Sequence, residues 1–146
     1  MTPVFCCGFE CGRLAASGHW EATAGSAAIS FNTTTVRNGA RSLRINPTAG
    51  LVTAQCKAFS ASNVIVMRIP IRFADLPDSS TAVLFTNVND IGVYFNATDN
   101  KLYTGTTTAG VPSFGASGVA VSINTWYLID VYINMSANPH TVDARV

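Results

Sequence analysis

Apolar and polar residues alternate along most of this chain, in short runs that are separated by Gly, Pro, Asn, Asp and Ser. A period of two residues is typical of β-strands, and no long stretch shows the 3.6-residue period of a helix. Residues 1–25 follow neither pattern and are predicted to form an irregular N-terminal segment of a single domain, residues 1–146. The pattern predicts strands at about 27–31, 41–46, 51–59, 63–73, 81–87, 91–96, 101–104, 118–122, 126–135 and 140–146.

Two of these predicted strands carry a long apolar row on one side. In the strand over residues 63–73 the row consists of Ile65, Met67, Ile69, Ile71 and Phe73. In the strand over residues 126–135 it consists of Tyr127, Ile129, Val131 and Ile133. Because successive side chains point to opposite faces of a sheet, two sheets with such rows can pack into a sandwich. The pattern predicts an all-β, two-sheet antiparallel sandwich with Ile69 and Ile129 in its core, on facing or adjacent strands.

Turn-forming pairs separate the predicted strands, among them Asn38-Gly39 and Asn89-Asp90. The segment Asn96–Lys101 lies between two β-type runs and contains Asp99-Asn100. This arrangement predicts a hairpin.

Charged residues make up only 12% of the chain, hydrophobic residues make up 48%, and the mean hydropathy is +0.28. The charged share is about half of what is usual for a soluble domain. Two interpretations fit this composition. Either other subunits cover much of the outer surface, or the exterior consists of neutral Ser, Thr and Asn.

The net charge of +1 argues against a nucleic-acid partner, which would require a basic stripe. No apolar run approaches the roughly 18 residues of a membrane span, so no membrane partner is expected.

No basic residue precedes the apolar start of the chain, which predicts that there is no signal peptide. The four cysteines are therefore expected to be reduced thiols, and their spacing matches no standard zinc motif.

Four segments stand in a characteristic order along the chain. They are Gly8-Phe9-Glu10-Cys11-Gly12 followed by Trp20, Asn38-Gly39-Ala40-Arg41-Ser42-Leu43-Arg44-Ile45, Ile71-Arg72-Phe73 with Leu76-Pro77, and Asn124-Thr125-Trp126-Tyr127-Leu128-Ile129-Asp130-Val131. Together they resemble the concanavalin A-like, laminin-G-like jelly-roll domains of phage and metagenomic proteins. The resemblance covers the chain from about residue 8 to the end. In those domains further strands usually follow the last segment seen here, so the sandwich is expected to be incomplete at its C-terminus.

This resemblance implies a sandwich that binds glycans, binds protein partners or serves as a structural domain. Phage tail and capsid proteins carry such domains without signal peptides, because virions assemble in the host cytoplasm. The final alternating run, residues 140–146, is expected to be an edge strand, a strand that pairs with another subunit, or the point of a truncation.

Few residues in this sequence could form a catalytic group. Glycoside hydrolysis normally requires two carboxylates that flank the bond, yet the only glutamates are Glu10 and Glu21 in the N-terminal segment. Asp130 is a lone carboxylate on a predicted strand, and neither His19 nor His140 has a nucleophile motif beside it. The sequence therefore predicts a protein that is not an enzyme.

Binding residues are easier to nominate. Aromatic, amide and charged side chains suited to sugars could share the outer face of one sheet, although ordinary packing and solvent exposure are the favoured explanation for them. These residues are Trp126, Tyr132, Tyr94, Arg68, Arg72, Asp130 and Asn134. Oxygen-bearing loop residues could also ligate calcium, but such residues more often simply form turns, so no cofactor is expected. These residues are Asn87, Asn89, Asp90, Asp99 and Asn100.

Two hypotheses from different functional classes follow. The first is a structural subunit of a virion, such as a capsid decoration or tail-associated protein, whose partners are copies of itself or other virion proteins. The second is a non-catalytic carbohydrate-binding module. Sparse charge, the absent signal and the final strand without a following turn favour the first, whereas a row of exposed aromatic residues would favour the second.

Overall fold

The regular structure in the described part of this chain consists of β-strands. The computed structural model describes residues 20–24, 29–46, 53–56, 64–85, 91–108, 111–134, 136 and 141–146. Within these ranges there are eleven strands and no helix, and hence no helix that could cross a membrane. The prediction of an all-β fold is therefore confirmed for the described residues. The strands belong to two compact units, Met1–Ala61 and Ser62–Val146.

The first unit contains two short antiparallel pairs. Strand β1 (Trp20–Ala24) pairs with β4 (Thr53–Cys56), and β2 (Ile29–Asn32) pairs with β3 (Ser42–Ile45). Strand β1 lies inside the segment for which the sequence predicts no regular structure, so residues 20–24 form a strand that the pattern does not indicate.

The connection between β2 and β3 shows why this sequence turns where it does. The Asn32 side-chain oxygen accepts hydrogen bonds from the backbone nitrogens of Thr34, at 2.7 Å, and Thr35, at 3.0 Å. Gly39 then adopts a φ of 79°, which a residue with a Cβ rarely adopts. The predicted Asn38-Gly39 turn is thus present in this connection.

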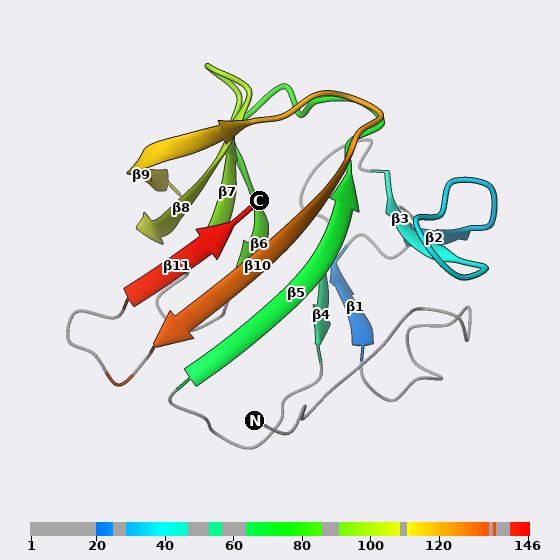
Figure 1. The fold of residues 1–146 in the computed structure, drawn as a ribbon, viewed down its shortest axis with the longest axis horizontal. Helices are drawn as coiled ribbons and strands as arrows, with labels where there is room; N and C mark the ends of the chain where they lie inside the picture. Colours follow the sequence, from blue (N-terminus) through cyan, green and yellow to red (C-terminus); the bar gives the residue numbers. More distant parts are fainter. Residues whose placement is uncertain are drawn as a thin grey trace. The chain divides into compact units, whose positions relative to one another are not determined.

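The second unit contains two antiparallel sheets (Figure 1). The three-stranded sheet has the order β11-β10-β5 and consists of β5 (Val64–Arg72), β10 (Trp126–Asn134) and β11 (Thr141–Arg145). The four-stranded sheet has the order β6-β7-β8-β9, in which sequential neighbours pair. Its strands are β6 (Thr81–Phe85), β7 (Gly92–Asn96), β8 (Lys101–Thr108) and β9 (Val111–Ala120).

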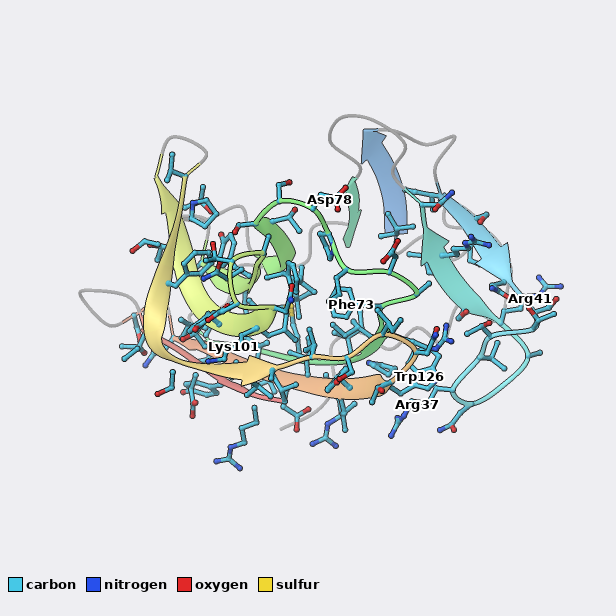
Figure 2. All side chains as sticks on the ribbon, turned by 90° about the horizontal axis from the view of Figure 1, so that it is seen from above. Arg37, Arg41, Phe73, Asp78, Lys101 and Trp126 are labelled. Atoms are coloured by element: carbon cyan, nitrogen blue, oxygen red, sulfur yellow. The ribbon has the colours of Figure 1, made fainter. Side chains whose placement is uncertain are left out.

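The apolar faces of these two sheets pack against each other as a sandwich. The buried cluster draws on both sheets and consists of Ile91, Val93, Phe95, Leu102, Val121, Ile129, Val131 and Ile133. The predicted row on β5 packs against this cluster, as does Tyr127 of β10, so both predicted inner faces are confirmed. Phe73, labelled in Figure 2, is packed against the same cluster, and its ring centroid is 5.8 Å from that of Phe95.

The hairpin between β7 and β8 has the predicted position. Residues 97–100 form the turn, and the backbone nitrogen of Asn100 donates to the carbonyl oxygen of Asn96 at 3.0 Å. Asn100 has a φ of 56°, in the left-handed region that Asn tolerates better than most residues. The Asp99-Asn100 signal therefore marks a real reversal of the chain.

Strands β8 and β9 are longer than the pattern predicts, because small residues and a proline weaken the alternation in them. Gly105 faces Phe114, and a Cβ at position 105 would collide with the backbone oxygen of Ser113. The glycine thus allows the two strands to approach closely. Pro112 has no N–H for a ladder, and it lies on β9, an outer strand of its sheet, where proline is tolerated.

Candidate functional site

The three-stranded sheet presents a second face on the side opposite the core. Strand alternation and register place thirteen side chains on this surface, which we name the outer face. Its members are Val64, Val66, Arg68, Pro70 and Arg72 of β5, Trp126, Leu128, Asp130, Tyr132 and Asn134 of β10, and Thr141, Asp143 and Arg145 of β11. Figure 2 shows side chains that project from both sides of this sheet.

A row of alternating charge crosses the outer face. Asp130 on β10 lies opposite Arg68 on one neighbouring strand and opposite Arg145 on the other. Arg68 donates two hydrogen bonds to the Asp130 carboxylate, from Nε to Oδ1 at 2.6 Å and from a terminal nitrogen to Oδ2 at 2.7 Å. Such a bidentate pair fixes both side chains more firmly than a single contact would.

The electrostatics of Asp130 follow from this row. The hydrogen bond from Arg68 lowers the pKa of Asp130 below its ordinary value of 3.8, and the positive charges of Arg68 and Arg145 act in the same direction. Partial burial opposes this shift. The pKa of Arg68 is raised in turn by its hydrogen bond to Asp130. Asp130 is thus a fixed anion at neutral pH.

Beside the charged row, the outer face exposes apolar surface. Val66 and Tyr132 lie directly opposite each other on β5 and β10 and are 55% and 43% exposed. Pro70, further along β5, is also exposed and lies opposite the half-buried Leu128. Apolar and aromatic groups therefore adjoin a rigid ion pair on one pleated surface.

At the far end of the face, Trp126 lies opposite Arg72. A terminal nitrogen of Arg72 donates to the side-chain oxygen of Asn124 at 2.5 Å. Asn124 also donates its backbone N–H to the carbonyl oxygen of Phe73 at 2.7 Å, and it has a φ of 62°. These bonds tie the start of β10 to the end of β5 and hold Arg72 along the face.

The structure brings together six of the seven residues nominated from the sequence, and the seventh, Tyr94, does not belong with them. Tyr94 lies on β7 of the four-stranded sheet and is only 1% exposed. It lies opposite Tyr103 on β8, and its ring lies close to Gly105 of the same strand. Strand alternation alone does not reveal that this outward-pointing side chain is covered.

The loop residues nominated for calcium are not gathered in the described part of the chain. Asn87, Asn89 and Asp90 lie outside the described residues. Asp99 accepts a hydrogen bond from the Tyr103 hydroxyl at 2.5 Å and lies 3.8 Å from the Lys101 amine. Among the described residues, no group of three or more His, Cys, Asp or Glu side chains could hold a metal. The expectation that these residues form turns and that the protein holds no cofactor stays a prediction.

Sequence reasoning did not nominate Thr141, Asp143 and Arg145, which complete the outer face. Asp143 lies opposite Tyr132, and Arg145 lies opposite Asp130. The alternation over residues 140–146 contained the necessary signal, because every second residue of a strand shares one face. What the pattern lacked was the pairing of β11 with β10, which places these side chains beside the nominated ones.

The outer face can bind a partner by surface complementarity. Its charged row supplies paired donors and acceptors, and its neighbouring row supplies exposed apolar and aromatic surface. Compared with known proteins, the chain matches no protein-family model, no curated protein and no solved structure.

Proposed function

We propose that this chain is a structural or assembly subunit of a virion, a capsid decoration or tail-associated protein, built on a lectin-like jelly-roll sandwich. Its partners are copies of itself or other virion proteins, and assembly takes place in the host cytoplasm. The observation that carries the proposal is the outer face, on which Val66 and Tyr132 expose 55% and 43% of their surface side by side. Adjacent exposed apolar groups are typical of contact surfaces.

The sparse charge of the chain supports the same proposal. Only 12% of the residues are charged, and Arg68 and Asp130 neutralise each other on the outer face. A partner that covers this face would bury this neutralised pair, and it would have to offer polar or charged groups to Arg72, Asp143 and Arg145, because unpaired charges are costly to remove from water. The geometry favours a protein contact of moderate polarity.

The jelly-roll part of the proposal rests on the resemblance of the four sequence segments described above. The two packed antiparallel sheets of the second unit are consistent with it. In this proposal the lectin-like architecture serves as a scaffold whose broad sheet surfaces make the contacts.

A binding role rather than catalysis is also part of the proposal. A glycosidase requires one carboxyl group whose pKa is raised, so that it can donate a proton. The pKa of Asp130 is instead lowered by Arg68, and its carboxylate is occupied by two hydrogen bonds. Asp130 is therefore suited to hold a fixed charge.

The alternative is a non-catalytic carbohydrate-binding module. The observation that favours it is the position of Tyr132, whose exposed aromatic ring lies on the outer face. Tyr132 is two residues along β10 from Asp130, the partner of Arg68. A sugar could stack on the ring while the charged pair bonds to its hydroxyls. In that case Trp126, Arg72 and Asn134 would extend the site along β10 and β5.

The oligomeric state of the purified chain tests the proposal. Native mass spectrometry and analytical ultracentrifugation at micromolar concentration should show a defined assembly, and a glycan-array screen should show no specific ligand. A monomer that binds one oligosaccharide would contradict the assembly role and establish the carbohydrate-binding alternative.

A matched pair of variants locates the contact. Val66→Ser and Val111→Ser each replace an exposed valine on a strand, but Val111 lies on β9 of the other sheet and is 68% exposed. If the outer face makes the contact, Val66→Ser should weaken assembly and Val111→Ser should leave it unchanged. Equal effects of the two variants would show that the contact lies elsewhere.

A further inference from the structure

Strand β11 is an outer strand of the three-stranded sheet. Among the described residues it pairs with β10 on one side, and no described strand pairs with its other side. The free side of such a strand presents backbone N–H and C=O groups that can form a ladder with another strand. This edge is therefore a candidate contact, and its side chains decide which partner fits.

The charges on β11 form a short self-complementary pattern. Asp143 and Arg145 are two residues apart, so both side chains lie on the outer face, and both residues are exposed. Among the described residues, neither of them makes an ion pair. Two antiparallel copies of this pattern can place each acid opposite the base of the other copy.

We infer that two copies of this chain associate through antiparallel pairing of their β11 strands, with Asp143 of each copy opposite Arg145 of the other. The inference rests on the proposed assembly function and identifies one partner as a second copy. In this register Ala144 faces Ala144 of the second copy at the two-fold axis. The small side chain at this point allows close approach of the strands.

The charged row of the outer face continues across this contact. Arg68 lies opposite Asp130, and Asp130 lies opposite Arg145. Arg145 would then lie opposite Asp143 of the second copy, so that positive and negative charges alternate across four neighbouring strands. Opposite charges on directly paired residues stabilise a sheet, whereas like charges destabilise it.

Other symmetric registers lack this complementarity. Pairing centred on Asp143 would place two carboxylates face to face, and pairing centred on Arg145 would do the same with two guanidinium groups.

The register centred on Ala144 also places Val142, which packs against the core, opposite Val146 on the inner side. Because cross-strand neighbours share a face, the two outer faces would join into one continuous surface that carries Val66 and Tyr132 of both copies.

Charge-reversal variants test the inference in the full chain. Asp143→Lys and Arg145→Glu each place like charges opposite each other twice in the symmetric contact. Each variant alone should therefore dimerise at least roughly tenfold more weakly than the unmodified chain, measured by analytical ultracentrifugation. An equimolar mixture should recover the dimer, because Lys at position 143 then faces Glu at position 145. The doubly substituted chain should self-associate for the same reason.

Two controls match the changes in net charge. Asp78→Lys and Arg41→Glu alter exposed residues outside β11 and should leave dimerisation unchanged. Thermal unfolding of every variant identifies any loss of folding, and the recovery of dimer in the mixture cannot arise from misfolded chains.

The outcomes separate the inference from the proposed function. An assembly that persists unchanged in both single variants would overturn the β11 contact and leave the assembly role in place. Loss of assembly without recovery in the mixture would also overturn the predicted register. A monomeric unmodified chain at micromolar concentration would contradict both proposals.

Discussion

Ile129 and Ile69 lie directly opposite each other on β10 and β5, on the side of the three-stranded sheet that faces the core. Ile129 is fully buried, whereas Ile69 is partly buried and packs against the same cluster. The sequence predicts both as core residues on facing or adjacent strands, and the structure shows that their strands are adjacent. At this pair, the inner face predicted from the alternating sequence is the face that packs in the core of the sandwich.

Truncation of this pair should destabilise the fold. We expect Ile129→Ala to lower the free energy of unfolding by about 2–5 kcal/mol, the usual range for a buried aliphatic side chain. Ile69→Ala should have a smaller effect because that side chain is only partly buried. Chemical denaturation measures both. Val66→Ala on the outer face is the control and should change stability by less than about 0.5 kcal/mol. Equal losses for Val66→Ala and Ile129→Ala would contradict the assignment of faces.

Close packing between β8 and β9 gives a second prediction. A Cβ at position 118 would lie 2.6 Å from Cε1 of Tyr103 and closer still to Cζ. The Tyr103 ring cannot easily move aside, since its hydroxyl bonds to Asp99 and its centroid lies 5.4 Å from that of Phe114. Gly118→Ala should therefore destabilise the fold by about 1–3 kcal/mol.

A double-mutant cycle isolates the cause of this effect. In a Tyr103→Thr background the ring is absent, so the added methyl group of Gly118→Ala should change stability little. Ser117→Ala, at an exposed neighbour on the same strand, is the control and should be nearly neutral. A penalty for Gly118→Ala that is the same in both backgrounds would mean that the Tyr103 ring does not limit the space at this position.

The turn between β7 and β8 gives a third prediction. Asn100 has a φ of 56°, which disfavours a side chain with an ordinary Cβ. Asn100→Ala should lower the free energy of unfolding by about 1 kcal/mol, whereas Asn100→Gly should be close to neutral. Thr98→Ala in the same turn is the control, because the contact that Thr98 makes to the described residues is a hydrogen bond from its backbone nitrogen to Asn96. A larger loss for Asn100→Gly than for Asn100→Ala would contradict the backbone explanation.

Local pattern explains which features could be predicted from the sequence. The faces of β5 and β10 were predictable because each strand alternates over nine residues. Strand β9 was only partly predictable, because Pro112, Gly115 and Gly118 interrupt its pattern. The contacts in the charged row could not be predicted from local sequence, since Arg68 and Asp130 are 62 residues apart and are brought together by the pairing of their strands.

The misplacement of Tyr94 has a different physical origin. Alternation correctly separates Tyr94 from Phe95, which points into the core between the sheets. However, a single strand does not reveal whether its other face is solvent-exposed. That depends on which residues pack over this face, as Gly105 of β8 does beside the Tyr94 ring. Burial of the side of a sheet that faces away from the core depends on the whole fold, and the sequence of the strand itself does not indicate it.

The Arg68–Asp130 pair gives the last prediction, on the pH dependence of stability. The pKa of Asp130 is lower in the folded chain than its ordinary value of 3.8, mainly because Arg68 donates hydrogen bonds to the carboxylate. A carboxyl group of this kind stabilises the fold above its unfolded pKa, and this contribution is lost as the pH falls through the folded pKa. The contribution is small at neutral pH, because the Arg68 and Asp130 side chains are 70% and 34% exposed and solvent screens the pair.

Three measurements check this reasoning. In a titration followed by NMR, the Asp130 carboxyl should protonate below pH 3.8, and Arg68→Gln should move its pKa upward. Asp130→Asn should remove the corresponding part of the acid sensitivity of unfolding, because no proton can then bind at this position. High salt should weaken the effect in the unmodified chain, since ions screen exposed pairs. An Asp130 pKa that does not respond to Arg68→Gln would show that the bidentate pair does not control this carboxylate, and the fixed anion at the centre of the outer face would need another cause.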